Sequence, residues 1–574
     1  MKVSAQIEKL IAARGDPLRL ATVHVELAHG DWPDERRDLL RELLLIASIP
    51  HWFDDTVLSA VAGAGSVSLT MKGELDALTC VERFAGRGPT ARNVNQGTRQ
   101  ALRQALSETD PKRLRELSAR AAAYFAPDSS TAGRVEHLYH LLVADPEGGA
   151  TACSRLRDLW GVESVPEHQR ALALAMQELI DTGMLQGRAQ GAARMLILTE
   201  RRERDEASVS YAEAAEVRAL VEGSADPLDL VRALDLEGQT AMEQDDQPCA
   251  RQRFSEALTR LESLVAEAPE DVCRLHLLAV ARTRLGDLEL AAGKPSALAH
   301  FSGAVEALDR LVAVEPTNTG LQRERAVAIA RRGDVLLNMS GRLADAGRDQ
   351  RMALEVLSAL VDAEPQNENR LRDLALQLQR IGDAALADRD MSQALSAYER
   401  AAHISRRLVA SDPACLRWQG DLAAQLRSVG EALQAVERFD AAELLLEEAH
   451  ALYTHLAALQ PEHFAWLRDL QGSLYALGRA AKARKRMDSA LTHFSAARDV
   501  AATMVTSRPH DLPVRHEHAC TLNQLGQVYA ALNQSDLAAA NYAEAVRVME
   551  TVVAEMPDSE LWQQDLANLR TWLA

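Results

Sequence analysis

A repeat of about 48 residues dominates the chain from residue 269 onward. Seven prolines recur there at separations of 47 to 49 residues: Pro269, Pro316, Pro365, Pro413, Pro461, Pro509 and Pro557. A glycine follows each of the first six prolines after 17 residues: Gly286, Gly333, Gly382, Gly430, Gly478 and Gly526. Such a fixed period indicates a stacked architecture, in which each unit buries its apolar face against its neighbours.

Each repeat has the apolar spacing of two helices. In the unit after Pro365, apolar residues four and three apart occur twice, on either side of a polar turn: Leu374, Leu378, Ile381 and then Ala394, Tyr398, Ala401. This spacing places them on one face of a helix. Because proline cannot continue a helix, each second helix is predicted to end just before the next proline.

The second half of the unit resembles the tetratricopeptide repeat, a helix pair of about 34 residues. The matching residues are a Leu-Gly pair, a small residue, an aromatic residue and an alanine, as in Leu525-Gly526, Ala538, Tyr542 and Ala545. We interpret the additional residues as about two extra turns on each helix. The resemblance implies an all-α, right-handed superhelical solenoid whose first helices line a concave groove.

The residues before the repeats have a different pattern. Helical spacing is predicted over Ile7–Ala13, Glu35–Ile46, Asp54–Val61 and from Gln96, with two short extended pieces at Cys80–Phe84 and Ala91–Val94 around a Gly/Pro turn. This order resembles a winged-helix domain. We therefore expect three parts: a winged-helix-like domain (1–126), a helical bridge (127–226) and repeats with a C-terminal capping helix (227–574).

The segment after the extended pieces resembles another family. Residues 93–102 and 136–142 are similar to the linker between winged helix and repeats in signal-transduction ATPases with numerous domains, the STAND class. In that class a histidine on this segment senses the nucleotide, whereas Asn95 stands here. The sequence also lacks a glycine-rich loop ending in Lys-Ser/Thr, which would hold phosphates. The chain thus resembles the sensor half of such a protein without its nucleotide-binding domain.

Composition restricts the partners and the compartment. The formal net charge of −19 makes nucleic acid and anionic membranes unfavourable partners over most of the surface. Apolar runs are too short to span a membrane, and the first residues lack the apolar core of a signal peptide, so we expect a cytoplasmic protein. Six widely scattered cysteines without a C-x-x-C pair predict thiols rather than disulfides or a zinc site.

The sequence predicts no enzyme, cofactor or metal site. It contains none of the local motifs that mark a hydrolase elbow, a metalloprotease helix or a cysteine nucleophile. His137 and His140 lie three residues apart, but no third ligand is spaced to join them, so we interpret them as packing residues. Trp418, Trp466 and Trp562, each five residues after a proline, are interpreted as anchors between neighbouring hairpins.

The tetratricopeptide resemblance implies which residues would contact a partner. The residue after each repeat glycine belongs to the groove, and the first four such residues form an acidic ladder: Asp287, Asp334, Asp383 and Glu431. The residue three before the glycine adds Gln379, Arg427, Tyr475 and Asn523. The ladder favours a basic peptide, or is simply a solvated acidic surface. A second acidic series is interpreted as helix-dipole compensation and contacts between hairpins: Asp373, Asp421, Asp469, Glu517 and Asp565.

Three functions remain open at this stage. The first is a non-enzymatic adaptor that binds a protein partner, such as a separately encoded caspase-like protease or signalling ATPase in a bacterial defence or regulatory cassette. The second is a DNA-binding regulator, since Arg87 and Arg92 flank the wing tip in a locally basic segment. The third is a substrate or inhibitor of a protease, cleaved between residues 127 and 133. The partner and the oligomeric state are not specified by the sequence.

Overall fold

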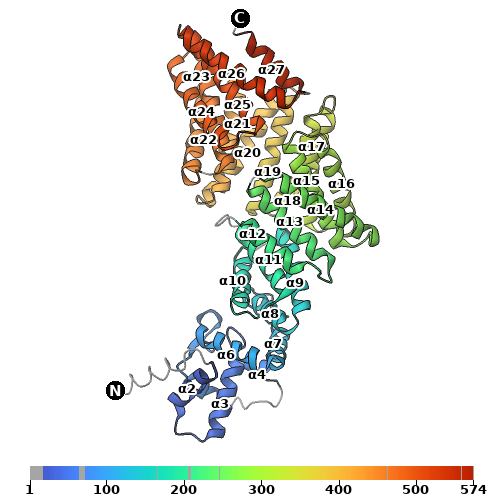
Figure 1. Ribbon diagram of the computed structural model, residues 1–574, viewed down its shortest axis with the longest axis vertical. Helices are drawn as coiled ribbons and strands as arrows, with labels where there is room; N and C mark the ends of the chain where they lie inside the picture. The colour runs from blue at the N-terminus through green and yellow to red at the C-terminus, as the bar shows by residue number, and fades with distance from the viewer. Residues whose placement is uncertain are drawn as a thin grey trace, which may run out of the picture. The chain divides into compact units, whose positions relative to one another are not determined.

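The computed structural model describes residues 17–63, 71–163, 166–203, 209–244, 246–461, 463–557 and 559–572. The chain forms two compact units, unit 1 (Met1–Leu288) and unit 2 (Glu289–Ala574), which are described separately. The fold is all-α with one small β-hairpin near the N-terminus, and the helix pairs stack as in tetratricopeptide proteins (Figure 1). The helix expected over Ile7–Ala13 lies outside the described residues.

Unit 1 begins with helices around a two-stranded hairpin. Strands β1 and β2 are antiparallel, with Val81 opposite Val94 and Arg83 opposite Arg92. The predicted extended pieces are thereby confirmed as a hairpin. Helices α2 and α5 were not predicted from the sequence, and α5 is only five residues long. The elements are α2 (Pro17–His29), α3 (Asp34–Ala47), α4 (Asp55–Ala62), α5 (Lys72–Asp76), β1 (Val81–Arg83), the 3₁₀ helix η2 (Ala85–Arg87), β2 (Arg92–Val94) and α6 (Gln96–Thr109).

The rest of unit 1 is a stack of helices. Helices α7 to α11 share a core with the N-terminal helices and the hairpin, and this core includes Phe53, Phe125 and Tyr139, which are almost completely buried. The helix pair that Pro227 opens is α13 and α14, and α15 crosses the boundary between the two units. The elements are α7 (Pro111–Phe125), α8 (Thr131–Ala144), α9 (Pro146–Glu163), α10 (Pro166–Asp181), α11 (Gly187–Glu203), α12 (Tyr211–Val221), α13 (Pro227–Glu243), α14 (Gln247–Glu267) and α15 (Val272–Ala291).

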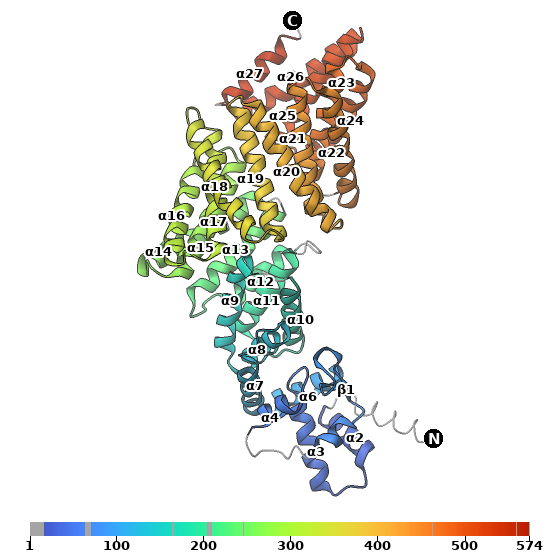
Figure 2. The same cartoon turned by 180° about the vertical axis from the view of Figure 1, so that it is seen from behind.

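Unit 2 is an array of helix pairs. Each pair has a first helix that carries the repeat glycine and a second helix that packs antiparallel against it (Figure 2). Four first helices begin 48 residues apart, at Glu368, Leu416, Phe464 and Leu512. The elements are α16 (Ala297–Val314), α17 (Thr319–Leu337), α18 (Leu343–Ala363), α19 (Glu368–Ala387), α20 (Met391–Ser411), α21 (Leu416–Ala435), α22 (Phe439–Leu459), α23 (Phe464–Ala483), α24 (Met487–Ser507), α25 (Leu512–Ala531), α26 (Ser535–Glu555) and α27 (Glu560–Arg570).

The repeat glycine is required by close packing within each pair. A Cβ on Gly478 would lie 2.7 Å from the ring of Phe494, and a Cβ on Gly526 would lie 2.5 Å from the ring of Tyr542. Carbon atoms normally approach to about 3.5 Å. The large side chain of the second helix therefore rests directly on the backbone of the first, which only glycine permits.

The turn between the two helices of a pair contains a left-handed residue. Its φ is +66° at Gly293 and +75° at Gly341, where glycine adopts this conformation without strain. The same turn position is occupied by other residues in the later pairs, with φ close to +60°: Arg389, Glu437, Lys485 and Asn533. A residue with a Cβ is strained in this conformation, whereas glycine is not.

Two of the three tryptophans expected as anchors, Trp466 and Trp562, pack against a neighbouring hairpin. Trp466 is 9% exposed and packs with Ala423, Tyr453 and Leu456 of the preceding pair. The last helix, α27, packs Leu566 and Leu569 against α25 and α26. Within the described ranges, none of the helices combines the length and apolar character needed to cross a bilayer.

Candidate functional site

The predicted partner-binding residues of unit 2 lie on its first helices. We call the surface formed by α17, α19, α21, α23 and α25 the first-helix face. Successive members contact one another, as α17 does with α19 and α21 does with α23. The predicted residues on this face are Asp334 on α17, Gln379 and Asp383 on α19, Arg427 and Glu431 on α21, Tyr475 on α23 and Asn523 on α25.

Asp287 lies in unit 1 instead. It is half-buried on α15 and lines a small hollow with Arg284 and Phe254. The acidic ladder expected from the sequence is thus distributed over two units: one carboxylate belongs to unit 1, and Asp334, Asp383 and Glu431 belong to unit 2.

Asp334 is largely committed to contacts within the array. Gln350 Nε2 donates to its Oδ1 at 2.9 Å, and Arg380 Nε donates to its Oδ2 at 3.0 Å. These bonds join α17 to the second helix of its own pair and to the next first helix. Asp334 is therefore a structural residue at least as much as a candidate contact.

Asp383 and Glu431 are more available to a partner. Asp383 is exposed and accepts one hydrogen bond, from the Tyr398 hydroxyl at 2.6 Å. Burial of the phenol and the adjacent Asp383 carboxylate raise the pKa of Tyr398, so this hydroxyl stays protonated as a donor. The side chain of Glu431 is 42% exposed, with Arg427 Nη1 3.6 Å away.

The remaining predicted contacts are half-buried. Arg427 Nε is enclosed without a hydrogen-bond partner among the described residues. Tyr475 packs edge-on against Phe494, with ring centroids 5.6 Å apart. Asn523 Oδ1 accepts from Gln527 Nε2 at 3.4 Å within α25. These residues give the face a mixed polar character between its carboxylates.

The second acidic series forms ion pairs between neighbouring first helices. Four of its five acids, all except Asp469, contact a basic residue of the preceding first helix, and we call each such pair an inter-helix rung. The rungs are Arg323–Asp373, Arg372–Asp421, Arg468–Glu517 and His516–Asp565. The contacts between hairpins expected from the sequence are present, but the sequence analysis did not identify the basic partners. The recurrence of a basic residue ten positions before the glycine was the available signal.

The arginines expected near the wing tip are bonded within unit 1. Arg87 donates to Ser130 Oγ at 2.6 Å and to Asp128 Oδ2 at 3.3 Å, and its guanidinium lies over the ring of Trp52. Arg92 donates to the carbonyl oxygens of residues 89 and 91, each at 3.0 Å. Both side chains are thus engaged by protein groups.

The same contacts involve the segment expected as a cleavage site. Ser130 Oγ caps α8 by accepting from the backbone of Gly133, and Asp128 accepts from the backbone of Ser130. Asn95, which was compared with a sensor histidine on the basis of the sequence, caps α6 by accepting from Thr98 N at 3.0 Å. In this structure Asn95 has a helix-capping role.

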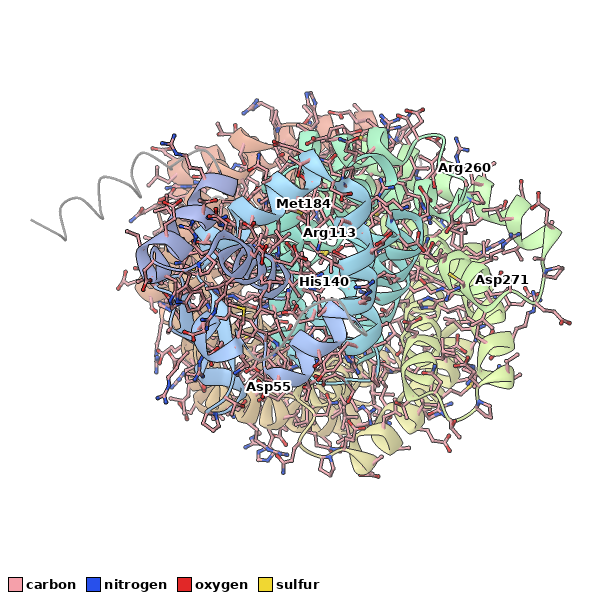
Figure 3. The ribbon with its side chains drawn as sticks, turned by 90° about the horizontal axis from the view of Figure 1, so that it is seen from below. Asp55, Arg113, His140, Met184, Arg260 and Asp271 are labelled. Atoms are coloured by element: carbon pink, nitrogen blue, oxygen red, sulfur yellow. The ribbon has the colours of Figure 1, made fainter. Side chains whose placement is uncertain are left out.

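A buried ionic cluster joins the loop after α3 to α6, α8 and α10 in unit 1. Arg103, 2% exposed, donates to Glu178 Oε1 at 3.0 Å and to the Tyr139 hydroxyl at 2.5 Å. Glu136 lies between His51 Nδ1 at 2.9 Å and His140 Nε2 at 3.2 Å. Figure 3 labels His140, which is 1% exposed.

Burial sets the charge state of this cluster. It lowers the pKa of His140 to about 4, although Glu136 partly opposes the shift. The pKa of Glu136 is lowered by the two histidines despite its burial. His137 instead shares a hydrogen bond of 2.9 Å with the carbonyl of residue 122. The two histidines singled out in the sequence thus have separate packing environments, and no metal-holding group of His, Cys, Asp and Glu occurs among the described residues.

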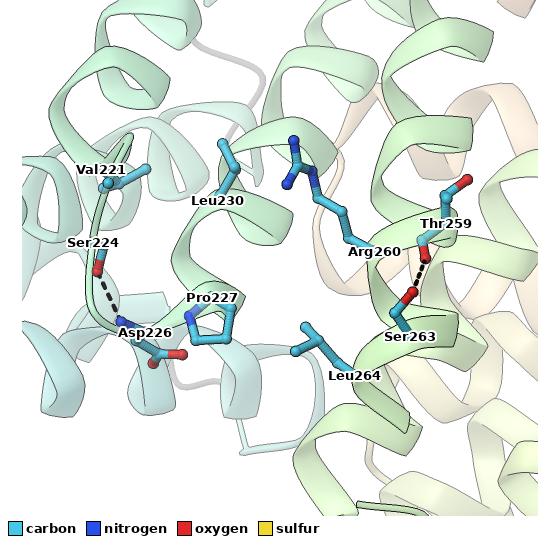
Figure 4. Close-up of a pocket in the computed structure, with 10 residues that line it drawn as sticks. Val221, Ser224, Asp226, Pro227, Leu230, Thr259, Arg260, Ser263 and Leu264 are labelled. Atoms are coloured by element: carbon cyan, nitrogen blue, oxygen red, sulfur yellow. Dashed lines mark hydrogen bonds between the residues drawn. The ribbon is translucent and has the colours of Figure 1, made fainter. Parts of the chain in front are cut away.

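An open pocket of about 460 Å³ lies between the α12–α13 turn and α14 in unit 1 (Figure 4). Its polar groups are already bonded within the chain. Asp226 caps α13 by accepting from Leu228 N, and Arg260 pairs with Glu256 one turn away at 3.0 Å. Ser263 Oγ donates to the backbone carbonyl of Thr259. These polar side chains are therefore not available to bind a ligand in the pocket.

Comparison with known proteins yields structural likeness only. No family model and no curated protein sequence matches the chain. Similar solved structures include a STAND protein with a tetratricopeptide repeat sensor from Pyrococcus horikoshii, at 10% identity over 99% of this chain and 71% of that chain, with a TM-score of 0.45. A Rap protein complexed with competence and sporulation factor is 12% identical over 71% of this chain and 99% of that chain, with a TM-score of 0.47. The apo quorum sensor NprR from B. thuringiensis is 11% identical over 71% of this chain and its entire length, with a TM-score of 0.46.

Proposed function

We propose that the protein is a non-enzymatic adaptor that binds a basic segment of a protein partner on the first-helix face of unit 2. One observation carries this proposal. Asp383 and Glu431 occupy the same position on neighbouring first helices and are exposed or half-exposed, and the contacts recorded for them are the Tyr398 hydroxyl on Asp383 and Arg427 at 3.6 Å from Glu431. A basic segment would meet complementary charge at a fixed spacing.

We infer that the N-terminal part supports partner binding through contacts inside the protein and does not itself bind DNA. We interpret the described helices and hairpin within residues 1–126 as a winged-helix-like domain, and the engagement of Arg87 by Asp128 and Ser130 favours an internal contact over DNA binding. The buried thiols of Cys80 and Cys153 fit a reducing compartment, so we place the protein in the cytoplasm. The partner class implied by the STAND-like resemblance is a separately encoded effector protein.

The adaptor proposal is tested by affinity capture from the native cytosol with three proteins. These are the intact chain, a variant with Asp383→Ala and Glu431→Ala, and a control with Glu399→Ala and Glu447→Ala. The control removes two exposed carboxylates from the second helices α20 and α22, so it changes net charge equally. We expect a partner that the intact chain and the control retain and the first variant loses. Equal capture by all three proteins would contradict the proposal.

Salt dependence provides a second measurement on the captured partner. Exposed charges interact over about 10 Å at 0.1 M salt and over much less at 1 M. Binding through Asp383 and Glu431 should therefore weaken as salt rises, and the variant lacking both carboxylates should show a smaller salt effect. A partner that binds equally at low and high salt would not use this face electrostatically.

A further inference from the structure

The inter-helix rungs of unit 2 follow one geometric rule. The basic residue stands ten positions before its repeat glycine, and in the three arginine rungs the acid stands nine positions before the next repeat glycine. In all three arginine rungs, Nε and Nη2 both donate to the carboxylate: Arg323 to Asp373, Arg372 to Asp421 and Arg468 to Glu517. This two-pronged contact suits a planar guanidinium and a carboxylate.

The series is interrupted between α21 and α23. Gly420 stands on α21 where the other helices carry arginine or histidine, and Asp469 stands at the acidic position of α23. Across the described part of the chain, Asp469 has neither a hydrogen bond nor an ion pair. Both residues are half-buried. A carboxylate that is partly removed from water and has no donor is less stable than a paired one, so this position can gain free energy from an added cation.

The space for a side chain is present beside Gly420. A Cβ at this position would meet Trp466 Nε1 at 3.7 Å and Leu456 Cδ1 at 3.8 Å, which are ordinary contact distances. Gly420 differs in this from repeat glycines such as Gly430 and Gly478, where a side chain of the second helix fills the space. Because Gly420 is only half-buried, the position is also accessible from solvent.

The last rung of the array shows how a basic side chain is placed at the position that corresponds to Gly420. The His516 imidazole is stacked on Trp562, with ring centroids 5.9 Å apart, and its Nε2 lies 2.9 Å from Asp565 Oδ2. Trp466 and Asp469 have the same sequence offsets from Gly420 that Trp562 and Asp565 have from His516. The tryptophan and the acid of a rung are therefore retained at Gly420, and the basic side chain alone is replaced.

The surrounding charges leave Asp469 without full compensation. Burial raises the pKa of Asp469, and the like charge of Glu517 acts in the same direction. Arg427, Arg468 and His463 oppose this effect but do not outweigh it. Arg468 is already engaged by Glu517 in its own rung, and Arg427 lies nearest Glu431. A guanidinium supplied from outside the chain would find an acceptor that no neighbour has saturated.

We propose that Gly420, Trp466 and Asp469 form a binding site for an arginine side chain of a partner protein, which completes the missing rung from outside. This inference rests on the proposed function, that the first-helix face receives a protein segment, and names the residue that the face recognises. The site prefers arginine to lysine, because the filled rungs use the Nε–Nη2 edge of a guanidinium, which an ammonium lacks.

The geometry of the site is tested first without a ligand, by introducing an arginine at position 420 of the chain itself. Gly420→Arg should form the rung with Asp469 and raise the thermal midpoint of unfolding. Part of this gain comes from the better helix propensity of arginine and is independent of Asp469. The same substitution is therefore made in an Asp469→Asn background. We expect a clearly smaller gain there, and an equal gain in both backgrounds would overturn the proposed geometry.

The binding site is tested next with a photoreactive probe, the peptide acetyl-Gly-Arg-(p-benzoylphenylalanine)-Gly-amide. Crosslinks should map to α21 and α23. The crosslinking yield should fall about tenfold when citrulline, the uncharged analogue of arginine, replaces the arginine of the probe. With the arginine probe, the yield should fall by the same factor in the Asp469→Asn and Gly420→Arg proteins. Asp421→Asn is the matched control, because Arg372 already fills that rung. Equal yields from all proteins and both peptides would overturn the proposal.

Failure of this inference can be distinguished from failure of the proposed function. If capture depends on Asp383 and Glu431 but is indifferent to Asp469→Asn and Gly420→Arg, the face binds its partner without an arginine site. If the probe crosslinks at the site but capture ignores Asp383 and Glu431, the arginine site exists and the adaptor proposal is wrong in its location.

Discussion

The close contact between the repeat glycine and the second helix gives the most direct stability prediction. In Gly478→Ala, the new methyl group would lie 2.7 Å from Phe494, whose side chain is completely buried. The ring must retreat by about 0.8 Å to reach a normal contact distance of about 3.5 Å. Overpacking of this kind costs about 1–3 kcal/mol. Replacing a mid-helix glycine by alanine offsets about 1 kcal/mol of this cost.

Gly472 of the same helix provides the matched control. A Cβ there would meet only Arg427 Nη1, at 3.6 Å, so Gly472→Ala should gain helix propensity without overlap. Because both substitutions lie inside α23, their propensity gains are similar. The stability difference between the two variants therefore isolates the overlap, and we expect it to be about 1–3 kcal/mol.

Hydrogen exchange of α23 and α24 is the suitable measurement, because repeat arrays open in parts rather than as one unit. Gly478→Ala should accelerate exchange in both helices, and Gly472→Ala should slow it. In a Phe494→Ala background the overlap disappears, so Gly478→Ala should become neutral or stabilising there. Equal protection of the two single variants would refute the packing explanation for the repeat glycine.

Three further outcomes are expected. Glu437→Gly should stabilise the α21–α22 pair by about 1 kcal/mol, measured by thermal unfolding, because glycine relieves the left-handed backbone; a loss would contradict this. Arg103→Met should cost unit 1 about 3–5 kcal/mol in urea unfolding, because Glu178 loses a buried partner; a loss below 1 kcal/mol would be inconsistent. Since the folded pKa of His140 is about 4 and the unfolded value about 6.5, the unfolded chain binds more protons between these values. The stability of unit 1 should therefore fall by up to about 3 kcal/mol as pH drops from 6.5 to 4, and His140→Gln should flatten that profile.

Much of the helix array was predictable because its signals are local. A proline that ends one helix and a glycine that admits a large side chain both act within a single hairpin, so their recurrence marks each pair in the sequence. The hairpin strands were also found, since the Gly86–Pro89 turn separates two extended pieces. The helix α5 was missed because five residues are too few to show a helical period.

The contacts between repeats were less accessible to sequence reasoning. Asp373 and Asp421 were assigned to hairpin contacts, but the residues that bind them lie about 50 positions earlier, on another helix. The left-handed turn position was likewise overlooked, although Gly293 and Gly341 mark it in two pairs. Residues such as Glu437 occupy it elsewhere because tertiary packing compensates the local strain.

The sequence alone determined the period, the helix pairs and the close approach within each pair, because these follow from backbone sterics and apolar spacing over a few turns. Only the tertiary structure decided which charged residues are already used. It paired Arg87 with Asp128, tied Asp334 to Arg380, and left Asp469 without a hydrogen bond or an ion pair among the described residues. Whether a charge is satisfied depends on distances between separate helices, and a linear pattern does not contain those distances.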